Sequence, residues 1–535
     1  MFGQLWKAMK STGILFYIVA LQLASLLFVT GKGAGQIYLD MFLILLLITL
    51  TMFFFAKVNG GNSKIVIYTI VLITIGIMLQ VIFKQESILA KPDLYGTGNP
   101  AAGLQMQYLI ALVAGITASF LYKKGKYLAR PNVIKGMYLF SVILYAVTLI
   151  FAKAVGNAKN WILIGGFSIQ TSEINKLLYI FILAGILGGV ENPSRKRIGF
   201  AFLVTITNLF FLILQSEFGT ILLLLFVFPV FLFLFVPDIK VVLFTIAGYL
   251  GIGISAAGVG TLITKLAAGS EAFAGMSIVR FFLSNYNKIA NRVIYWLYPE
   301  RDPMGLGYQL LKAKEAILLG GWFGTDSISD LPVKTSDMVF PALIERCGII
   351  VAVLVLIVIV LLWLEGIRVF IRKKDKYHRA VCAGMVFMLF YQALIIVGGS
   401  CGMCPLTGIT LPFISSGGSS LLVCSIMIGI VITISGKLEW EGELEHEEME
   451  LEFKLFKKNA DCAESFAALC HRYASVFDQN LRGFAGRFRR GGSGEDGCGV
   501  CPEPERVCEG TDCGPEWGDF SQFEDPTGGE NLYES

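Results

Sequence analysis

Long apolar runs dominate the chain, in place of the alternation of apolar and polar residues that marks a half-buried strand. A helix needs about 20 residues to cross a bilayer, and twelve runs come close to that length or exceed it. They predict an all-α polytopic membrane protein with about 12 transmembrane helices. The predicted spans are Thr12–Thr30, Ile37–Val58, Ile65–Phe83, Leu104–Tyr122, Met137–Val155, Ile174–Val190, Ile198–Leu214, Phe218–Val236, Val241–Val259, Met338–Leu364, Ala380–Val397 and Leu411–Ile434.

Composition and charge refine this picture. Hydrophobic residues make up 55% of the chain and charged residues 16%, whereas a soluble domain has about 25% charged residues. The first 435 residues hold 34 basic and 17 acidic residues, and the remaining residues hold 10 basic and 23 acidic ones. The chain is therefore a basic membrane body followed by an acidic tail. No small-residue cleavage site follows the first apolar run, which we interpret as a retained span.

Clusters of cations predict the orientation. They follow the fourth, sixth and tenth spans, and lysine and arginine are enriched in cytoplasmic loops. Because all three clusters lie at even-numbered exits, we expect a multi-pass protein with both termini in the cytoplasm. The clustered residues are Lys123, Lys124, Lys126, Arg130 and Lys135, then Arg195, Lys196 and Arg197, then Arg368, Arg372, Lys373, Lys374, Lys376 and Arg379.

The longest predicted connection, Gly260–Asp337, has 78 residues and lies on the outer side. A loop of this length usually has a structure or function of its own. Within it, Ser277–Tyr298 has an amphipathic helical pattern. We expect this helix either to lie on the outer membrane face or to pack as an ordinary loop helix.

The residue inventory excludes several kinds of site. The three histidines, His378, His446 and His471, are all predicted to be cytoplasmic. An outer Ser-His-Asp or Cys-His triad and an outer histidine-bearing zinc site are therefore excluded. The chain has no GxxxxGK[ST] loop, which argues against an ATP-driven pump. Its basic residues flank spans and form no single patch, which argues against nucleic-acid binding.

Carboxylates and cations of the outer loop remain as candidates for chemistry. Asp337 directly precedes an apolar run, where partial desolvation raises a carboxyl pKa and makes a stronger base. The alternative is that Ser336 or Asp337 caps the helix that follows. Glu345 is two turns further along that helix and needs a partner, for which Arg346 is available. The loop cations suit an anionic, phosphate-bearing lipid, or they only solvate the loop.

Four segments resemble one family, FtsW/RodA/SpoVE, also called SEDS. They are Asn157–Leu177, with "SIQTSEINK"; Gln215–Thr220, "QSEFGT"; Asp302–Gly348, with "TSDMVFPALIERCG"; and Tyr391–Leu422, with "LPFISSGGSSLL". Their order and spacing agree with the family over about half of the chain. The resemblance implies a ten-helix core, to which this chain adds two N-terminal helices. We divide the chain into N-terminal helices (1–156), a SEDS core (157–435) with an outer loop (260–337), and a cytoplasmic tail (436–535).

The resemblance implies a peptidoglycan glycosyltransferase that polymerises lipid II, the lipid-pyrophosphate-linked disaccharide pentapeptide, outside the bacterial cytoplasmic membrane. Asp337 occupies the position of the family's essential aspartate and would be the general base of an inverting transfer. Lys176 is the matched candidate for holding the pyrophosphate, with Arg292 and Lys312 as weaker ones. A divalent cation, Mg²⁺ or Mn²⁺, is an optional assistant. The expected partner is a class B penicillin-binding protein, a transpeptidase.

Other motif residues have two interpretations each. Glu173 and Glu217 are substrate ligands or hydrogen-bond anchors, and Glu345 joins them as a candidate. Ser415 and Ser419 lie in a segment broken by prolines and glycines, which either lines the substrate cavity or forms a tight loop. Several residues depart from the family pattern, including Thr171, Ser216, Glu217, Thr335, Arg346, Ile396 and Ser416. A lipid II flippase and a non-catalytic scaffold of a cell-wall complex therefore remain alternatives.

The tail matches nothing in the family. Cys498, Cys501, Cys508 and Cys513 have a spacing that permits a structural zinc site, but the second interval is short for one. Disulfides are disfavoured in a reducing cytoplasm. We expect an acidic, largely disordered tether with free thiols.

Overall fold

The computed structural model describes residues 2–31, 35–90, 102–122, 125–155, 158–164, 167–190, 192–305, 307–326 and 329–436. The predicted disordered tail and its candidate zinc site lie outside these residues. Every predicted span corresponds to a helix, which confirms the all-α polytopic fold. Within the described residues, eleven helices are long and apolar enough to cross a membrane, and the apolar part of α1, Tyr17–Gly31, is shorter.

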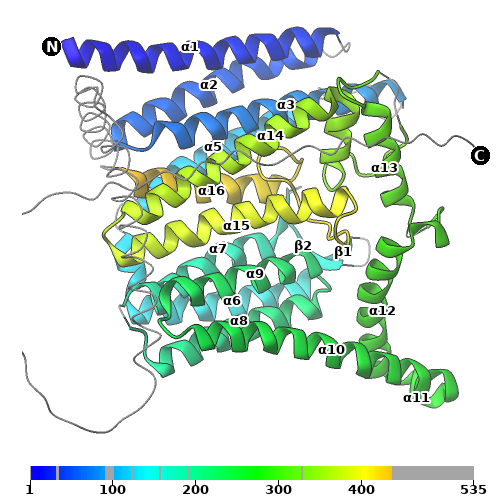
Figure 1. Cartoon of the computed structure of the whole chain (residues 1–535). Helices are drawn as coiled ribbons and strands as arrows, with labels where there is room; N and C mark the ends of the chain where they lie inside the picture. The colour runs from blue at the N-terminus through cyan, green and yellow to red at the C-terminus, as the bar shows by residue number, and fades with distance from the viewer. Residues whose placement is uncertain are drawn as a thin grey trace, which may run out of the picture. The chain divides into compact units, whose positions relative to one another are not determined.

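The spans pack side by side, as Figure 1 shows. Because most of them are apolar all round, they bury one side against neighbours and leave the other for lipid. In chain order they are α1 (Phe2–Gly31), α2 (Gly35–Asn59), α3 (Ser63–Ala90), α5 (Ala102–Tyr122), α6 (Pro131–Phe151), α7 (Thr171–Leu183) with its π-helical extension η2 (Ala184–Gly188), α8 (Arg195–Leu214), α9 (Phe218–Phe235), α10 (Ile239–Gly269), α14 (Val339–Arg372), α15 (Lys376–Ser400) and α16 (Gly418–Ser435). A short 3-10 helix, η1 (Gly125–Ala129), joins α5 to α6.

Several predicted span boundaries are wrong, and two of them show the physical reason. The ninth span was expected to end at Val259, but α10 continues to Gly269, because "GTLITKLAAG" contains good helix formers and no proline. The twelfth was expected to begin at Leu411, but α16 begins at Gly418. There the Ser415 hydroxyl accepts a hydrogen bond from the Leu411 backbone N–H at 2.9 Å and holds the preceding segment out of the helix.

A small sheet that the sequence pattern did not predict lies between α6 and α7. Its strands are β1 (Lys153–Val155), β2 (Ala158–Ile164) and β3 (Phe167–Gln170), paired antiparallel in that order. The fifth span was expected to include the residues of β1. In the β2–β3 ladder Trp161 lies opposite Gln170, and β3 runs directly into α7 at Thr171. The sheet thereby fixes where α7 begins.

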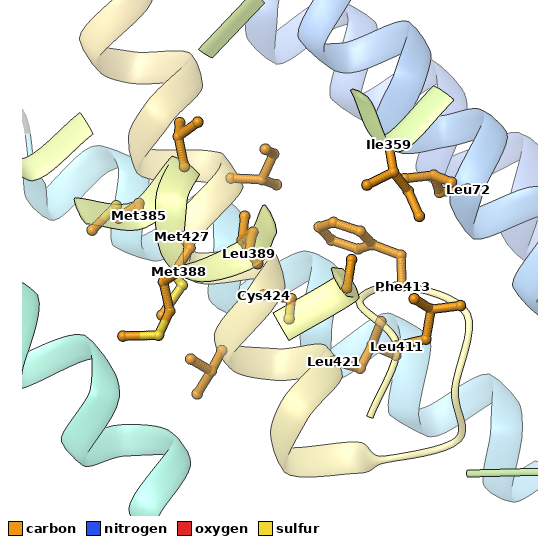
Figure 2. Packing of buried hydrophobic residues seen from close by; sticks show 14 of the residues in the cluster. Leu72, Ile359, Met385, Met388, Leu389, Leu411, Phe413, Leu421, Cys424 and Met427 are labelled. Atoms are coloured by element: carbon orange, nitrogen blue, oxygen red, sulfur yellow. The ribbon is translucent and has the colours of Figure 1, made fainter. Parts of the chain in front are cut away.

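The segment between α15 and α16 enters the bundle as non-helical backbone. Phe413 is 2% exposed, and Figure 2 shows its ring near Leu72 of α3 and Ile359 of α14. The segment passes so close to α3 that a Cβ on Gly76 would lie 2.4 Å from the Phe413 carbonyl oxygen. Only glycine fits at that position, so the approach is specified by the sequence.

The long connection after α10 crosses one end of the bundle (Figure 1). It contains α11 (Glu271–Gly275), α12 (Ser277–Leu297), the 3-10 helix η3 (Pro299–Arg301) and α13 (Tyr308–Gly320). The predicted helix at Ser277–Tyr298 is confirmed as α12. Only Val279 and Asn285 of α12 are buried, so this helix covers the bundle without entering its core.

Candidate functional site

A polar cavity of about 810 Å³ lies at the end of the bundle that α12 crosses. Its walls come from β2 and β3, the α8–α9 connection, α12, α13, the segment before α14 and the α15–α16 segment. A cavity of this size accommodates a small-molecule-sized group. Among the residues that line it are Trp161, Gln170, Ser216, Glu217, Lys288, Arg292, Trp296, Ser336, Asp337, Gly408, Thr410 and Ser420.

Asp337 lines this cavity and is partly buried. Burial raises its pKa, against the lowering effects of a hydrogen bond with Ser336 and of the Arg292 charge. The helix α14 begins at Val339, and its N-cap residue Met338 makes no side-chain cap hydrogen bond. The geometry therefore favours a carboxylate directed to the cavity over the capping alternative.

The backbone around Asp337 is held by the α15–α16 segment. The Ser415 hydroxyl donates to the Ser336 carbonyl at 2.8 Å, and the Ser416 hydroxyl donates to the Thr335 carbonyl at 2.9 Å. Gln80 of α3 also donates to the Thr335 carbonyl, at 3.0 Å. Ser415 thus acts on the backbone next to Asp337 and does not itself line the cavity.

Two cations of α12, Lys288 and Arg292, also line the cavity. Arg292 and Lys288 are four residues apart and so share one helix face. The Arg292 guanidinium donates to the Leu406 carbonyl at 2.8 Å. Burial lowers its pKa, and the Asp337 carboxylate opposes that effect. Burial and the Arg292 charge lower the pKa of Lys288. Lys288 is a lining residue that the sequence analysis did not single out, although its four-residue spacing from Arg292 was a signal that could have identified it.

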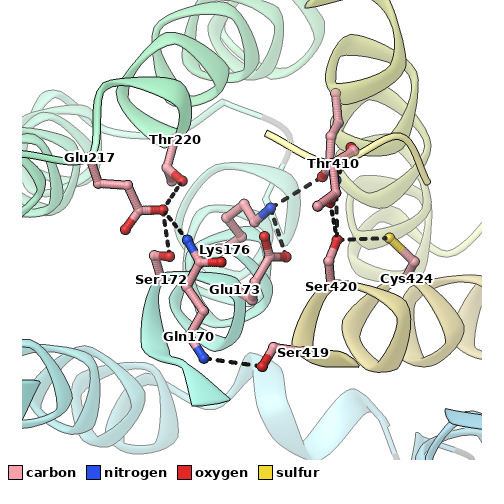
Figure 3. A network of polar contacts seen from close by, with 11 residues as sticks. Gln170, Ser172, Glu173, Lys176, Glu217, Thr220, Thr410, Ser419, Ser420 and Cys424 are labelled. Carbon is pink, nitrogen blue, oxygen red and sulfur yellow. Dashed lines mark hydrogen bonds and ion pairs between the residues drawn. The ribbon is translucent and has the colours of Figure 1, made fainter. Parts of the chain in front are cut away.

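Glu217 also reaches the cavity, just before α9. One of its oxygens, Oε1, accepts hydrogen bonds from Gln170 at 2.9 Å, from Ser172 at 2.6 Å and from Thr220 at 2.7 Å. Figure 3 shows this cluster. Burial raises the pKa of Glu217. The residue joins β3, α7 and α9 at the cavity wall, which agrees with the anchoring alternative.

Lys176 lies behind the cavity lining, with 2% of its surface exposed. Its ammonium pairs with Glu173 at 2.8 Å and donates to Gln392 at 3.1 Å. Gln392 in turn donates to the carbonyl of Thr410, a lining residue, at 2.9 Å. Lys176 and Glu173 therefore contact the cavity only through other groups.

Three further candidates lie outside the lining. Ser419 accepts from the Gln170 backbone N–H and donates to the Ser168 carbonyl, both at 3.1 Å (Figure 3 shows the first contact). Lys312 of α13 pairs with Glu315 at 2.7 Å. Glu345 is buried and accepts from the Ser329 backbone N–H at 2.6 Å. Of the predicted site residues, Asp337, Arg292 and Glu217 therefore line the same cavity, and the other candidates do not.

The described residues around the cavity do not form a set of protein ligands for a divalent cation. Across the described ranges, no group of three or more histidine, cysteine, aspartate or glutamate side chains could hold a metal ion. Asp337 and Glu217 are the carboxylates named in the lining, and Glu217 already accepts three hydrogen bonds. No step described below depends on a metal.

Comparison with known proteins decides the family. Residues 63–439 match FtsW/RodA/SpoVE, described as cell cycle proteins. The chain belongs to this family. Within the FtsW/RodA/SpoVE proteins it is 30% identical to stage V sporulation protein E of Bacillus subtilis over 393 residues, which cover 71% of this chain and 98% of that protein. It is 28% identical to peptidoglycan glycosyltransferase MrdB of Escherichia coli (strain K12) over 317 residues, 57% of this chain and 79% of that protein.

The fold has also been seen in a solved structure of this kind. A chain from "Structural coordination of polymerization and crosslinking by a peptidoglycan synthase complex" is 22% identical, with a TM-score of 0.53 over 70% of this chain and 98% of that one. The FtsW/RodA/SpoVE match starts at residue 63, where α3 begins, so α1 and α2 precede it. The division at residue 156 stays a prediction.

Proposed function

We propose that this protein is a peptidoglycan glycosyltransferase that polymerises lipid II at the outer face of the bacterial cytoplasmic membrane. The observation that carries the proposal is the placement of Asp337 on a polar cavity that the α12 cations Lys288 and Arg292 also line. The family supports it, since relatives such as MrdB are named peptidoglycan glycosyltransferases. A scaffold would have no need for a carboxylate on this cavity. A proton-driven flippase could use one, and the assay below separates it from a polymerase.

Asp337 is the general base in this mechanism. The 4-hydroxyl of the acceptor N-acetylglucosamine attacks C1 of the donor N-acetylmuramic acid, and Asp337 removes the hydroxyl proton. A new C1–O bond forms while the bond from C1 to the pyrophosphate oxygen breaks. The lipid pyrophosphate leaves as a stable anion and needs no general acid. Among the described residues, Glu217 is the other carboxylate that lines the cavity, and its Oε1 holds three hydrogen bonds at the wall. We therefore assign Glu217 to anchoring, which leaves a direct displacement with inversion at C1.

The cations of α12 are suited to the leaving pyrophosphate. Guanidinium groups bind phosphate oxygens in pairs, and an ammonium adds a point charge. Arg292 and Lys288 line the cavity, where cations held in place would attract the developing anion. The proposed binding by Lys176 and Lys312 remains a prediction, and both already pair with glutamates.

The position of the cavity relative to the basic clusters supports the orientation. Arg195–Arg197 begin α8, whereas Ser216 and Glu217, just after its end, line the cavity. A helix of 20 residues spans about 30 Å, which separates the two by the thickness of the hydrocarbon core. If the basic end faces the cytoplasm, the cavity opens outside, and Gly436 at the end of α16 leads into a cytoplasmic tail.

The expected partner is a class B penicillin-binding protein, which would crosslink the new strand. The second half of α10 is available for such contact, because Val259, Leu262 and Leu266 are all exposed. The solved complex whose title joins polymerization with crosslinking supports this pairing. Contact through the outer connection would couple the two reactions.

Polymerisation of purified lipid II by purified protein tests the proposal. We expect Asp337→Asn to lower glycan-chain synthesis by about 10²- to 10⁴-fold, the usual worth of a general base. Asp330→Asn is the matched control. Asp330 lies in the same connection, accepts a hydrogen bond from the Tyr308 hydroxyl at 2.9 Å, and is not among the residues that line the cavity.

Each alternative function predicts a different result. A wild-type protein that moves lipid II across vesicles without making polymer would be a flippase. A wild-type protein that does neither would be a scaffold. Polymer made equally well by Asp337→Asn would refute the assigned base.

A further inference from the structure

Two cysteines lie on the turn that follows α15. Cys401 and Cys404 are separated by Gly402 and Met403, and both are partly exposed. Met403 between them is 77% exposed, so the turn is open to solvent. The other cysteines of the described residues, Cys347, Cys382 and Cys424, are all buried in spans. The pair therefore differs from them in being reachable from outside the protein.

The turn brings the two cysteines together. The Met403 and Cys404 backbone N–H groups both donate to the Gly398 carbonyl, at 2.8 and 3.2 Å, and Gly402 has a φ of 77°. These bonds close a turn from Gly398 to Cys404, in which Cys401 and Cys404 are free thiols three positions apart. Residues three apart in a tight turn have Cα atoms within about 7 Å, close to the range of 4.4 to 6.8 Å that a disulfide requires. Burial first, and then the neighbouring Cys404, raises the pKa of Cys401 to about 11. The effect of Cys404 on Cys401 agrees with thiols in proximity.

The same turn contacts the outer wall of the cavity. Trp296 of α12 donates to the Gly402 carbonyl at 2.8 Å. Two residues beyond Cys404, the Leu406 carbonyl accepts from Arg292 at 2.8 Å. The chain then continues through Thr407 and Gly408, which line the cavity. Any covalent constraint on the turn therefore acts on the surface against which α12 docks.

We propose that Cys401 and Cys404 form an intrachain disulfide at the outer face, which fixes the turn on which α12 docks. The inference rests on the outward orientation given under the proposed function. It depends on the compartment, since disulfides persist outside the cytoplasm and not within it. The tail cysteines, on the cytoplasmic side, would stay reduced.

The chemistry is a thiol–disulfide exchange with an extracytoplasmic oxidant that itself carries a protein disulfide. A thiolate of one cysteine attacks that disulfide, and the second cysteine then displaces the mixed disulfide. Two thiols lose two protons and two electrons, and the oxidant becomes a dithiol. Burial raises the pKa of both thiols. The reduced form thus lacks the thiolate stabilisation that makes a disulfide oxidising, and we expect a stable bond.

Sequential thiol labelling of native membranes tests the bond. Free thiols of the acid-quenched, denatured full-length protein are blocked with one maleimide, and thiols released by dithiothreitol are then labelled with a heavier one. We expect Cys401 and Cys404 to carry only the heavy label, and Cys382 and Cys424 only the light one. Light label on both cysteines of the turn would overturn the proposal, as would a disulfide that joins either one to another cysteine.

The effect on the turn is measured in the polymerisation assay. In the chain-entropy view, closing a loop this short favours the closed form on the order of tenfold. We expect reduction of the wild type to lower the rate severalfold, and Cys401→Ser/Cys404→Ser to have the lower rate with no response to reductant. Met403→Ala, on the same turn, is the control that should retain both bond and response. An equal response to reductant in the double variant would refute the assigned role.

The two proposals fail in different ways. A confirmed disulfide in a protein that makes no polymer would leave the bond standing and reject the glycosyltransferase. Polymer from a protein whose two cysteines are free thiols would reject the bond and leave the enzyme standing.

Discussion

The ion-pair cluster around Glu86 makes a quantitative prediction. Glu86, on α3, pairs with both Lys334 and Arg346, and the three side chains are 10%, 21% and 5% exposed. Lys334 lies three residues before Asp337. Arg346 stands where the resembling family often has a second glutamate. The cluster therefore joins α3 to both sides of the segment that positions Asp337.

Removing the glutamate alone should be costly. In Glu86→Leu the Arg346 guanidinium stays buried without its carboxylate, and breaking a buried pair from one side costs about 3–5 kcal/mol. In Arg346→Met, Glu86 keeps Lys334, so we expect roughly 1–2 kcal/mol. The double variant Glu86→Leu/Arg346→Met should resemble Arg346→Met, because the more exposed Lys334 turns to solvent. The coupling energy of the cycle then has a magnitude of about 3–5 kcal/mol, because the double variant does not incur the cost of Glu86→Leu alone.

Unfolding of the purified protein in detergent, with lipid II polymerisation beside it, measures this cycle. We expect activity to follow stability, with Glu86→Leu the least active. Glu315→Leu is the matched control: its pair with Lys312 is solvent-exposed, so its loss should cost no more than about 1 kcal/mol. Additive effects of the two substitutions, or a cost of Glu86→Leu as small as that of the control, would refute the reasoning.

Three further predictions concern the cavity. Since Asp337 must be ionised to act as base and burial raises its pKa above 3.8, kcat/KM should fall as the pH drops through that raised value; a rate independent of pH down to 3.8 would contradict it. The pKa of Glu217 is raised above 4.5 in the folded state, so folded Glu217 binds its proton more tightly and stability falls as pH rises through this interval. Glu217→Gln should therefore raise Tm at neutral pH relative to wild type, with no advantage below pH 4.5, as thermal unfolding in detergent would measure. Gly408 has a φ of 73°, and an added Cβ would lie 3.5 Å from Asp337 Oδ2; Gly408→Ala should cost about 1–2 kcal/mol of strain and lower kcat, and an unchanged kcat would count against it.

Hydropathy predicted the fold well because a bilayer imposes a length on each span. Hydropathy failed to predict the structure where backbone hydrogen bonds determine where a helix or strand begins and ends. The sheet at Lys153–Gln170 has short strands without strong alternation, so nothing separated its first strand from the preceding span. The start of α16 depends on the Ser415 hydroxyl that holds Leu411 out of the helix, a contact that hydrophobicity does not register.

The sequence could predict those site residues whose location depends on their position within a single helix or at its end. Asp337 follows from its place before a span, and Arg292 from an amphipathic helix. Lys176 did not reach the cavity because Glu173, one turn earlier on the same helix, captures its ammonium in the buried interior. Glu345 binds the Ser329 backbone, and Arg346 turns to Glu86 instead. Which partner each charged side chain binds depends on how helices distant in the sequence pack together, and the sequence of a single helix does not give that packing.

The arrangement of α12 has a consequence for how a product leaves. The other cavity walls belong to spans or to segments anchored among them, whereas α12 lies across their ends on side-chain hydrogen bonds such as those of Arg292 and Trp296. Each such bond contributes only about 1 kcal/mol. If the protein is the polymerase proposed above, the lengthening strand has to move outward after every addition. We then expect α12 to be the wall that moves, while the lipid-embedded helices stay still. The number of additions before the strand is released would then depend on how often α12 moves away from the bundle.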